Sequence, residues 1–146
     1  MNSNFEKLKA DLSFWECSED NVLSVLEGKG YTVEKTSKTA LTDFLITKGK
    51  QKYYVELKTR KCKLKDYLDT IIGANKLWEA WNIYYKEGVE TLFFFKFEDG
   101  LYFYNPTSQY RKEFKAGRWD RWGIDSKKWW IYINNNVLKD GNEDDF

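Results

Sequence analysis

Three polar residues on neighbouring stretches of the sequence have the types and the spacing of a hydrolytic site. Glu56 and Lys58 are two residues apart in YYVELKTRK, a run that is typical of a β-strand, so both side chains point to the same face. Asp43 lies in the preceding strand candidate. A hairpin between the two strands can place Asp43 beside Glu56, whereas a slip of one residue would turn it away.

These residue types suit the hydrolysis of a phosphodiester. Paired carboxylates with water form a hard oxygen site for Mg²⁺, which binds phosphate oxygens and keeps several waters. The metal acidifies a water and neutralises charge on the phosphate, and a nearby Lys can orient the nucleophile or stabilise the transition state.

The spacing of Glu56 and Lys58 has little value by itself, because D/E-x-K occurs four times in the chain, starting at Glu27, Glu56, Glu113 and Asp125. Glu27 falls on the solvent side of a helix candidate, and the last two lie in an aromatic region without a regular period. Only Glu56 and Lys58 fall within a strand that follows another acid. Taken alone, this pair could equally be an ion pair on an exposed sheet, worth at most about 1 kcal/mol.

A third acid, Glu19, lies on a helix that is predicted from Ser18 to Lys29. Ser18 can cap this helix, and Gly30 ends it. The apolar stripe of the helix consists of Val22, Leu23 and Leu26. Glu19 lies three, four and seven residues before them, which places it on the same side of the helix. Its carboxylate is therefore expected to face the interior.

The elements that must position these residues are predicted in the order helix, three strands, helix and further strands. A short helix near Phe5–Leu12 precedes them. The three strands are predicted at Tyr31–Lys35, Asp43–Thr47 and Lys52–Thr59, the last two joined through KGKQ in a hairpin.

The second helix is predicted from Asp69 to Lys86, with Gly88 just past its end. One face of it carries Ile71, Ala74, Trp78, Trp81 and Tyr85, which are expected to pack against the rest of the protein. LFFFKF and LYFYN form a hairpin around Asp-Gly, and WWIYI forms a later strand. The order indicates an α/β fold or α+β sandwich, a mixed sheet with helices on it.

Composition is consistent with one domain over residues 1–146, because there is one Pro and no low-complexity linker. A core is expected over about residues 18–105, an aromatic and basic extension over about 106–138, and a frayed acidic tail over 139–146. Seven Trp exceed the usual need of a small core, which hints at a stacking surface or a partner interface.

Several functional classes are excluded by what the sequence lacks. There is no His, which excludes Ser-His-Asp and Cys-His catalysis and the HExxH zinc proteases. Cys17 and Cys62 have no metal-ligand spacing, so they are interpreted as incidental thiols in a reducing compartment. No apolar run approaches the roughly 20 residues of a membrane span. We expect a soluble, intracellular protein without a membrane segment or an organic cofactor.

Positive charge is concentrated around the candidate strand. The net charge is +1, but residues 48–65 contain eight Lys or Arg and one acid, Glu56. Such a band favours sequence-independent contacts with a phosphate backbone, although a solvated loop has the same composition. The later residues Arg118 and Arg121 alternate with aromatics that could stack on unpaired bases, or could instead cover the sheet or form a dimer interface.

TDFLI, YYVELKTR and the preceding SEDNVLSVLEGKGYTV together resemble the PD-(D/E)xK nuclease superfamily, which has the restriction-endonuclease-like fold. Within it, the chain is similar to Holliday-junction resolvase-type endonucleases. The resemblance covers about residues 18–97 and implies an αβββαβ core with a mixed central sheet flanked by helices. The sequence departs from the pattern at Thr42, where the motif that gives the family its name has Pro.

The resemblance also implies roles for individual residues. The implied catalytic residues are Asp43, Glu56, Lys58 and Glu19, and the three acids among them are implied as metal ligands. Among the residues expected to bind DNA, the resemblance implies Lys76, whereas the charge pattern points to Arg60, Lys61, Lys63, Lys65, Arg118 and Arg121. Mg²⁺ is the implied cofactor, with Mn²⁺ as a substitute.

The resulting hypothesis is a Mg²⁺-dependent DNA endonuclease that cuts by a metal-activated water. It is expected to select branched DNA and to act as a homodimer, because cutting two strands takes two active sites. A restriction, homing or repair endonuclease would use the same site. A non-catalytic nucleic-acid-binding module on the nuclease fold is the alternative from a different class.

Overall fold

The structure is a computed structural model that describes residues 17–36, 42–108, 114–120 and 127–146. Side chains are described from Trp130 onward in the last segment, and in the third segment only the backbone is described. The predicted helix near Phe5–Leu12 and the predicted DNA-binding residue Arg121 lie outside the described residues. The same is true of the side chain of Arg118.

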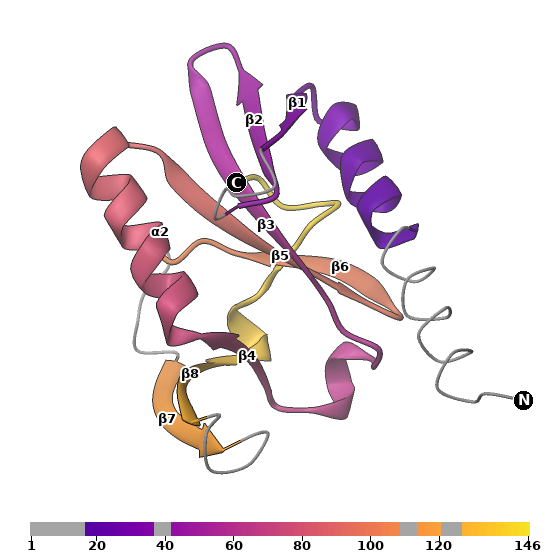
Figure 1. The fold of residues 1–146 in the computed structure, drawn as a ribbon. Coiled ribbons are helices and arrows are strands. Elements are labelled where there is room, and N and C mark those ends of the chain that lie inside the picture. Colours follow the sequence, from indigo (N-terminus) through magenta and orange to yellow (C-terminus); the bar gives the residue numbers. More distant parts are fainter. Residues whose placement is uncertain (1–16, 37–41, 109–113, 121–126) are drawn as a thin grey trace, which may run out of the picture.

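A twisted mixed sheet of six strands forms the centre of the protein, in the order β1-β2-β3-β5-β6-β9 (Figure 1). The strands are β1 (Thr32–Lys35), β2 (Phe44–Lys48), β3 (Gln51–Thr59), β5 (Glu90–Phe97), β6 (Gly100–Tyr104) and β9 (Lys139–Asp140). Strands β3 and β5 are parallel, and all other neighbours in the sheet are antiparallel. The predicted hairpins β2–β3 and β5–β6 are both present.

The first helix covers one face of this sheet and is described over residues 17–28. Its apolar residues Val22 and Leu26 are fully buried against side chains from four strands. The strand residues of this core are Phe44, Ile46, Val55, Leu57, Leu92, Phe94, Leu101 and Phe103. Their alternation along each strand is the reason that the intervening residues, Glu56 among them, point to the opposite face.

The opposite face is covered by the segment that connects β3 to β5. This connection contains a 3₁₀ turn, η1 (Leu64–Asp66), the strand β4 (Asp69–Gly73) and the helix α2 (Ala74–Glu87). The core on this side is formed by Ile72, Ala80, Phe93, Phe95, Phe97, Tyr104, Ile131 and Ile133. The parallel pairing of β3 and β5 requires such a crossover, because the chain must return to the starting end of the sheet.

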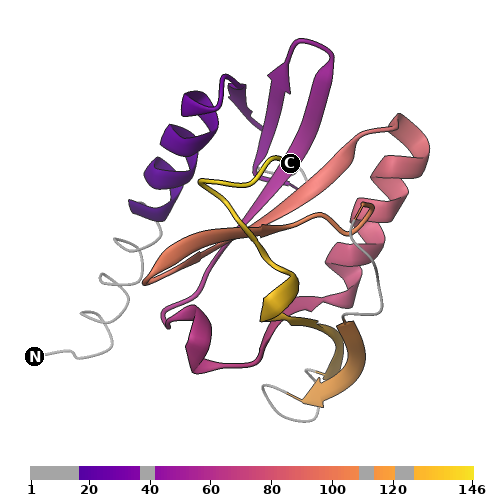
Figure 2. The same cartoon turned by 180° about the vertical axis from the view of Figure 1, so that it is seen from behind.

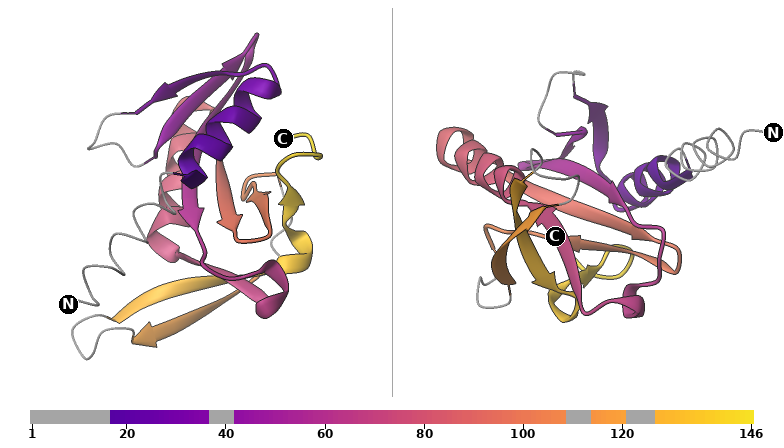
Figure 3. Two further views of the ribbon diagram at one scale, coloured as in Figure 1. Left: turned by 90° about the vertical axis from the view of Figure 1, so that its right-hand side faces the viewer. Right: turned by 60° about the horizontal axis from the view of Figure 1, so that its bottom comes forward.

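A second, three-stranded sheet corrects the predicted start of the second helix. Residues Asp69–Gly73 form β4, which pairs with β8 (Lys127–Asn134), and β8 pairs with β7 (Phe114–Asp120). The β-branched residues of DTIIG favour a strand, and Gly73 separates it from the helix. The predicted strand at WWIYI is part of β8. The β7–β8 hairpin projects away from the central sheet, as Figure 3 shows.

The face of α2 that packs on the sheet differs in part from the predicted one, since Ala74 packs against the core as expected but two aromatic residues do not. Trp78 and Tyr85, which are expected to be in the core, are 69% and 77% exposed. The contact is made instead through buried Ala80 and partly buried Leu77. A small residue at the contact allows the helix backbone to approach the sheet closely. Trp78 and Tyr85 are left on the outside, and Trp81 is half-buried.

The acidic tail is ordered, contrary to the expectation that it is frayed. Strand β9 pairs with β6, and the chain then crosses the sheet on the side of the first helix (Figure 2). The ring of Phe146 contacts the rings of Tyr31, Tyr53, Phe94 and Phe103 at centroid distances of 5.1–6.0 Å. This aromatic side chain holds the tail against the core.

No helix in the part of the chain that the structure describes is long and apolar enough to cross a membrane.

Candidate active site

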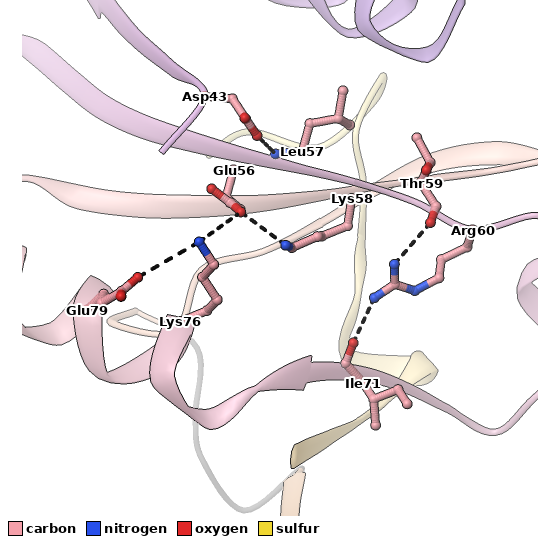
Figure 4. Close-up of polar contacts among 9 residues, drawn as sticks. All are labelled: Asp43, Glu56, Leu57, Lys58, Thr59, Arg60, Ile71, Lys76 and Glu79. Carbon is pink, nitrogen blue, oxygen red and sulfur yellow. Dashed lines mark hydrogen bonds and ion pairs between the residues drawn. The ribbon is translucent and has the colours of Figure 1, made fainter. Parts of the chain in front are cut away.

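Asp43 is held beside Glu56 by two hydrogen bonds to strand β3. Its backbone N–H donates to Val55 O at 2.9 Å, and its Oδ2 accepts from the Leu57 N–H at 2.7 Å. Val55 and Leu57 are the residues on either side of Glu56. The carboxylate of Asp43 thus continues the β2–β3 ladder just before the first residue of β2, Phe44, as Figure 4 shows.

Thr42, the residue before Asp43, takes the place of the Pro in the family motif. It is buried, and its carbonyl accepts a hydrogen bond from the Thr36 hydroxyl. The Thr36 N–H donates to Asp43 O at 3.0 Å. Thr36, just past the end of β1, therefore holds the turn that Pro would stiffen.

Glu56 lies on the face of β3 that α2 covers, and it is 6% exposed. Its Oε1 forms ion pairs with two ammonium groups, Lys58 Nζ at 3.1 Å and Lys76 Nζ at 3.6 Å. Lys76 comes from the first turn of α2 and also lies 3.9 Å from Glu79 Oε2. The crossover helix thus brings a cation, Lys76, and a third acid, Glu79, to the strand pair that carries Asp43 and Glu56 (Figure 4).

The charge state of Glu56 reflects a balance between burial and its neighbours. Burial raises the pKa of the Glu56 carboxyl above its ordinary value of 4.5, and the negative charge of Asp43 raises it further. The ammonium groups of Lys58 and Lys76 act in the opposite direction, but the pKa remains raised. Burial of the carboxyl therefore outweighs the stabilisation of its charged form by the two lysines.

A small pocket opens beside Glu56, between β3, β5 and α2. It is lined by Thr42, Glu56, Lys76, Glu79, Ala80, Ile83, Thr91 and Phe93. Polar groups from four separate segments meet here over an apolar floor. Glu79 in this pocket was not predicted from the sequence. Its spacing of three residues from Lys76 on one helix is the signal that could have identified it.

Glu19 does not lie in the pocket beside Glu56. Its side chain is 12% exposed, as its position on the apolar side of the helix predicts, and its Oε1 lies 2.9 Å from Lys35 Nζ on β1. Within the described residues, no group of three or more Cys, Asp and Glu side chains is close enough to hold a metal ion together. The structure brings Asp43 and Glu56 together but does not bring Glu19 to them. Its role as a third ligand stays a prediction.

The predicted DNA-binding residues have different environments. Lys61, Lys63 and Lys65 are exposed along the segment that follows β3. Arg60 is engaged within the protein: its guanidinium donates to Ile71 O at 2.8 Å and Thr59 O at 3.0 Å, and lies 5.7 Å from the Phe95 ring centroid. Arg60 thus ties β4 to the end of β3.

The donor set at the strand pair fits a hard divalent cation. Asp43 and Glu56 offer carboxylate oxygens, and Mg²⁺ needs only one or two carboxylates together with water and substrate phosphate. Burial is the main cause of the raised pKa of Glu56, and a divalent cation bound at the two carboxylates would favour the ionised form of Glu56.

The PD-(D/E)xK nuclease fold has a mixed sheet between helices, an Asp next to one strand and Glu-x-Lys in the following strand. Here Asp43 directly precedes β2, and Glu56 and Lys58 lie in β3. The family described as "Phage putative PDDEXK endonuclease" matches residues 9–137, and the chain belongs to this family. The resemblance to this superfamily and the predicted fold class are therefore confirmed.

Among solved structures, the chain is similar to Hjc from Archaeoglobus fulgidus, a Holliday junction resolvase from an archaeal hyperthermophile. The TM-score is 0.59 at 14% sequence identity, over 88% of this chain and 97% of that chain. At this identity the likeness concerns the fold. No curated protein sequence matches the chain.

Proposed function

We propose that this endonuclease-family protein is a metal-dependent deoxyribonuclease that hydrolyses phosphodiester bonds in branched DNA. The observation that carries the proposal is the convergence of Asp43, Glu56 and Lys58 at one point of the β2–β3 pair. The Asp43 carboxylate bonds to the residue after Glu56, and Lys58 Nζ lies 3.1 Å from Glu56 Oε1. An exposed ion pair would need neither the burial of Glu56 nor the neighbouring acid.

Asp43 and Glu56 would hold Mg²⁺, or Mn²⁺ in its place, through their carboxylate oxygens. When bound there, the cation would lower the pKa of a water and neutralise charge on the phosphate. Asp43 is fixed for this task by its bond to the Leu57 N–H. Glu56 is fixed by burial and by its lysine neighbours.

The lysines act on the phosphate itself. Hydrolysis joins a water oxygen to phosphorus, breaks the bond to the leaving deoxyribose oxygen, and transfers a proton to that oxygen. Lys58, on the same face as Glu56, is positioned to donate a hydrogen bond to the attacking water or to a non-bridging phosphate oxygen. Lys76 can add a second donor from α2. Charge that develops on the phosphate would be stabilised by these two ammonium groups.

Branched DNA is proposed as the substrate because the fold is similar to a Holliday junction resolvase. The exposed Lys61, Lys63 and Lys65 would contact the phosphate backbone without reading sequence. A homodimer is proposed because cutting two strands of a junction takes two sites. Action on plain duplex DNA, as in a restriction or repair enzyme, would use the same residues.

The test compares supercoiled, duplex, flap and four-way-junction DNA with Mg²⁺, with Mn²⁺ and with a chelator. Metal-dependent cutting that is fastest on the junction is the expected result. The absence of metal-dependent cutting on every substrate would refute the nuclease proposal. DNA binding without cutting would support the non-catalytic module instead.

Two variants serve as matched controls. Glu56→Gln keeps the shape of the side chain but removes its charge, and Glu27→Gln makes the same change at an exposed helix position. The first should abolish cutting while DNA binding persists, and the second should leave cutting unchanged. Calorimetry with Mn²⁺ should show a binding site in the wild type that is lost in Asp43→Asn.

A further inference from the structure

A second, larger groove lies next to the candidate active site, at the end of β3. Its lining comes from the end of β3 and the segment after it, from β4, from the end of β5, and from β8 and the residue that follows it. The lining includes Arg60, Lys61, Tyr67, Trp130, Tyr132 and Asn135. The Arg60 N–H donates to Lys96 O at 2.8 Å and so extends the β3–β5 pairing. Glu56, Lys58 and Arg60 therefore follow each other along one face, and the groove starts about 6.6 Å beyond Lys58.

Aromatic side chains form much of the wall of the groove. Tyr67 is 67% exposed. Trp130 and Tyr132 lie on the side of β8 opposite to Ile131 and Ile133, which are buried in the core. The alternation of the strand thus places two aromatic residues on the groove side. A third aromatic residue faces them from the η1–β4 segment.

The backbone under these aromatic residues is held in place. Asn135 Nδ2 donates to Leu64 O and to Tyr67 O, each at 2.9 Å. Arg60 donates to Ile71 O at 2.8 Å. Tyr67 is therefore an exposed ring on a fixed loop, so little backbone entropy is lost when a ligand stacks on it.

The charges that line the groove suit a nucleobase inside it and a phosphate only at the end near Lys58. Arg60 and Lys61 lie at the end near Lys58, where a phosphate backbone leaving the active site would pass. Asp66 and Asp69 also line the groove, and their carboxylates disfavour a phosphate inside it. A nucleobase carries both donors and acceptors and has no charge, so it can lie between rings with acids nearby.

We propose that this groove binds an unpaired nucleobase next to the phosphate that is cut, by stacking on Tyr67, Trp130 and Tyr132. The proposal rests on the proposed nuclease function, because it takes the DNA strand to pass Lys58. It adds a reason for substrate choice: a paired base inside a duplex cannot enter the groove, whereas a base at a branch point or flap can.

The experiment measures equilibrium binding by fluorescence anisotropy in the presence of a chelator, so that no DNA is cut. The probes are a labelled branched duplex with a short unpaired run of thymidines, the same DNA with abasic residues in that run, and a continuous duplex. The variants are Tyr67→Ala, Tyr67→Phe and Tyr85→Ala. Tyr85 on α2 is the matched control, because it is also exposed but lies outside the groove.

Tyr67→Ala should weaken binding of the unpaired thymidines about five-fold or more, which corresponds to about 1 kcal/mol of stacking. Binding of the abasic and continuous DNA should change by less than about two-fold. Tyr67→Phe should keep the affinity, since its ring still stacks, and Tyr85→Ala should have no effect on any probe.

Equal losses on the thymidine and abasic probes, or no loss on either, would overturn the proposal. A change in the oligomeric mass of Tyr67→Ala in sedimentation would also overturn it, because the groove would then be a protein interface. Failure of the nuclease proposal is a separate outcome. Base-dependent binding without any metal-dependent cutting would leave the groove as a base-binding site on a protein that does not cut.

Discussion

Replacing Asp43 with Ala should remove two things at once, a metal-binding carboxylate and a structural hydrogen bond. Asp43 Oδ2 accepts from the backbone N–H of Leu57 at 2.7 Å, and Leu57 is only 4% exposed. No backbone of β2 is aligned at this point to replace the lost acceptor, because β2 begins at Phe44. The Leu57 N–H would be left buried and unpaired.

The size of the effect follows from the type of bond. A hydrogen bond to a charged acceptor contributes about 1.5–3 kcal/mol, and a buried donor without a partner costs about 1–3 kcal/mol. We therefore expect Asp43→Ala to lower the free energy of unfolding by about 2 kcal/mol. For a chain of this length, this corresponds to a fall in Tm of about 4–8 °C.

The assay is urea unfolding followed by tryptophan fluorescence, with Asp43→Asn as the comparison. Asn keeps an oxygen acceptor but not the charge, so its cost should be about half that of Ala. Both variants should lose cutting. If Asp43→Ala unfolds within about 0.5 kcal/mol of the wild type, a value usual for a surface change, the hydrogen bond has no structural role and the reasoning fails.

Three further changes have defined outcomes. Glu56→Gln should be more stable than the wild type at pH 7, because the raised pKa means that ionised Glu56 costs folding energy. In the wild type, the free energy of unfolding falls as the pH rises above 4.5, because Glu56 ionises in the folded protein at a cost. The difference in free energy of unfolding between the two proteins, measured with urea, should therefore disappear below pH 4.5. Because the pKa of Glu56 is raised, the rate of cutting should fall on acidification at a higher pH than it would if the site used an exposed Glu with an ordinary pKa. Lys58→Met should lower the single-turnover rate of cutting about 10²–10³-fold, as loss of a transition-state donor does, with DNA affinity nearly unchanged; an unchanged rate would contradict its assigned role. Gly88→Ala should destabilise the protein by about 1 kcal/mol without affecting cutting, because Gly88 ends α2 with a φ of 71°; thermal unfolding would reveal it.

The strand pair that carries the candidate site could be predicted from the sequence because its signals are local. Alternation in YYVELKTRK separates Val55 and Leu57 from Glu56 and Lys58, and the short KGKQ turn limits the possible registers. The detail that could not be predicted is how Asp43 approaches. It does so through a side-chain bond to Leu57 after the regular ladder has ended.

The segment from Asp69 to Lys86 shows where local reasoning fails. Ile71, Trp78 and Tyr85 fit a helical stripe, so the pattern predicts a helix that begins too early and buries Trp78 and Tyr85, which are exposed. Strand β4 pairs with β8, about sixty residues later in the chain. No local pattern reveals this long-range pairing. The side of α2 that faces the sheet is chosen by close approach at Ala80 and by the attraction of Lys76 to Glu56.

Glu19 illustrates the limit of an inference from periodicity. The helical pattern correctly placed it on the apolar side, but burial toward a sheet does not determine which strand it meets. Its partner is Lys35 on the edge strand β1. A distance between two elements depends on their crossing angle, which is set by packing and not by either sequence alone.

The parallel pairing of β3 and β5 has a consequence for the order in which the protein assembles. The β2–β3 hairpin closes over a two-residue turn, so Asp43 and Glu56 can meet early and on a fast timescale. Lys76 arrives only when the whole crossover of residues 60–89 has docked, a step with a larger entropic barrier. Pulse-labelled hydrogen exchange during refolding should therefore protect Asp43 N–H before the amides of α2. The nascent chain would hold its acidic pair before the helix that supplies Lys76 is in place.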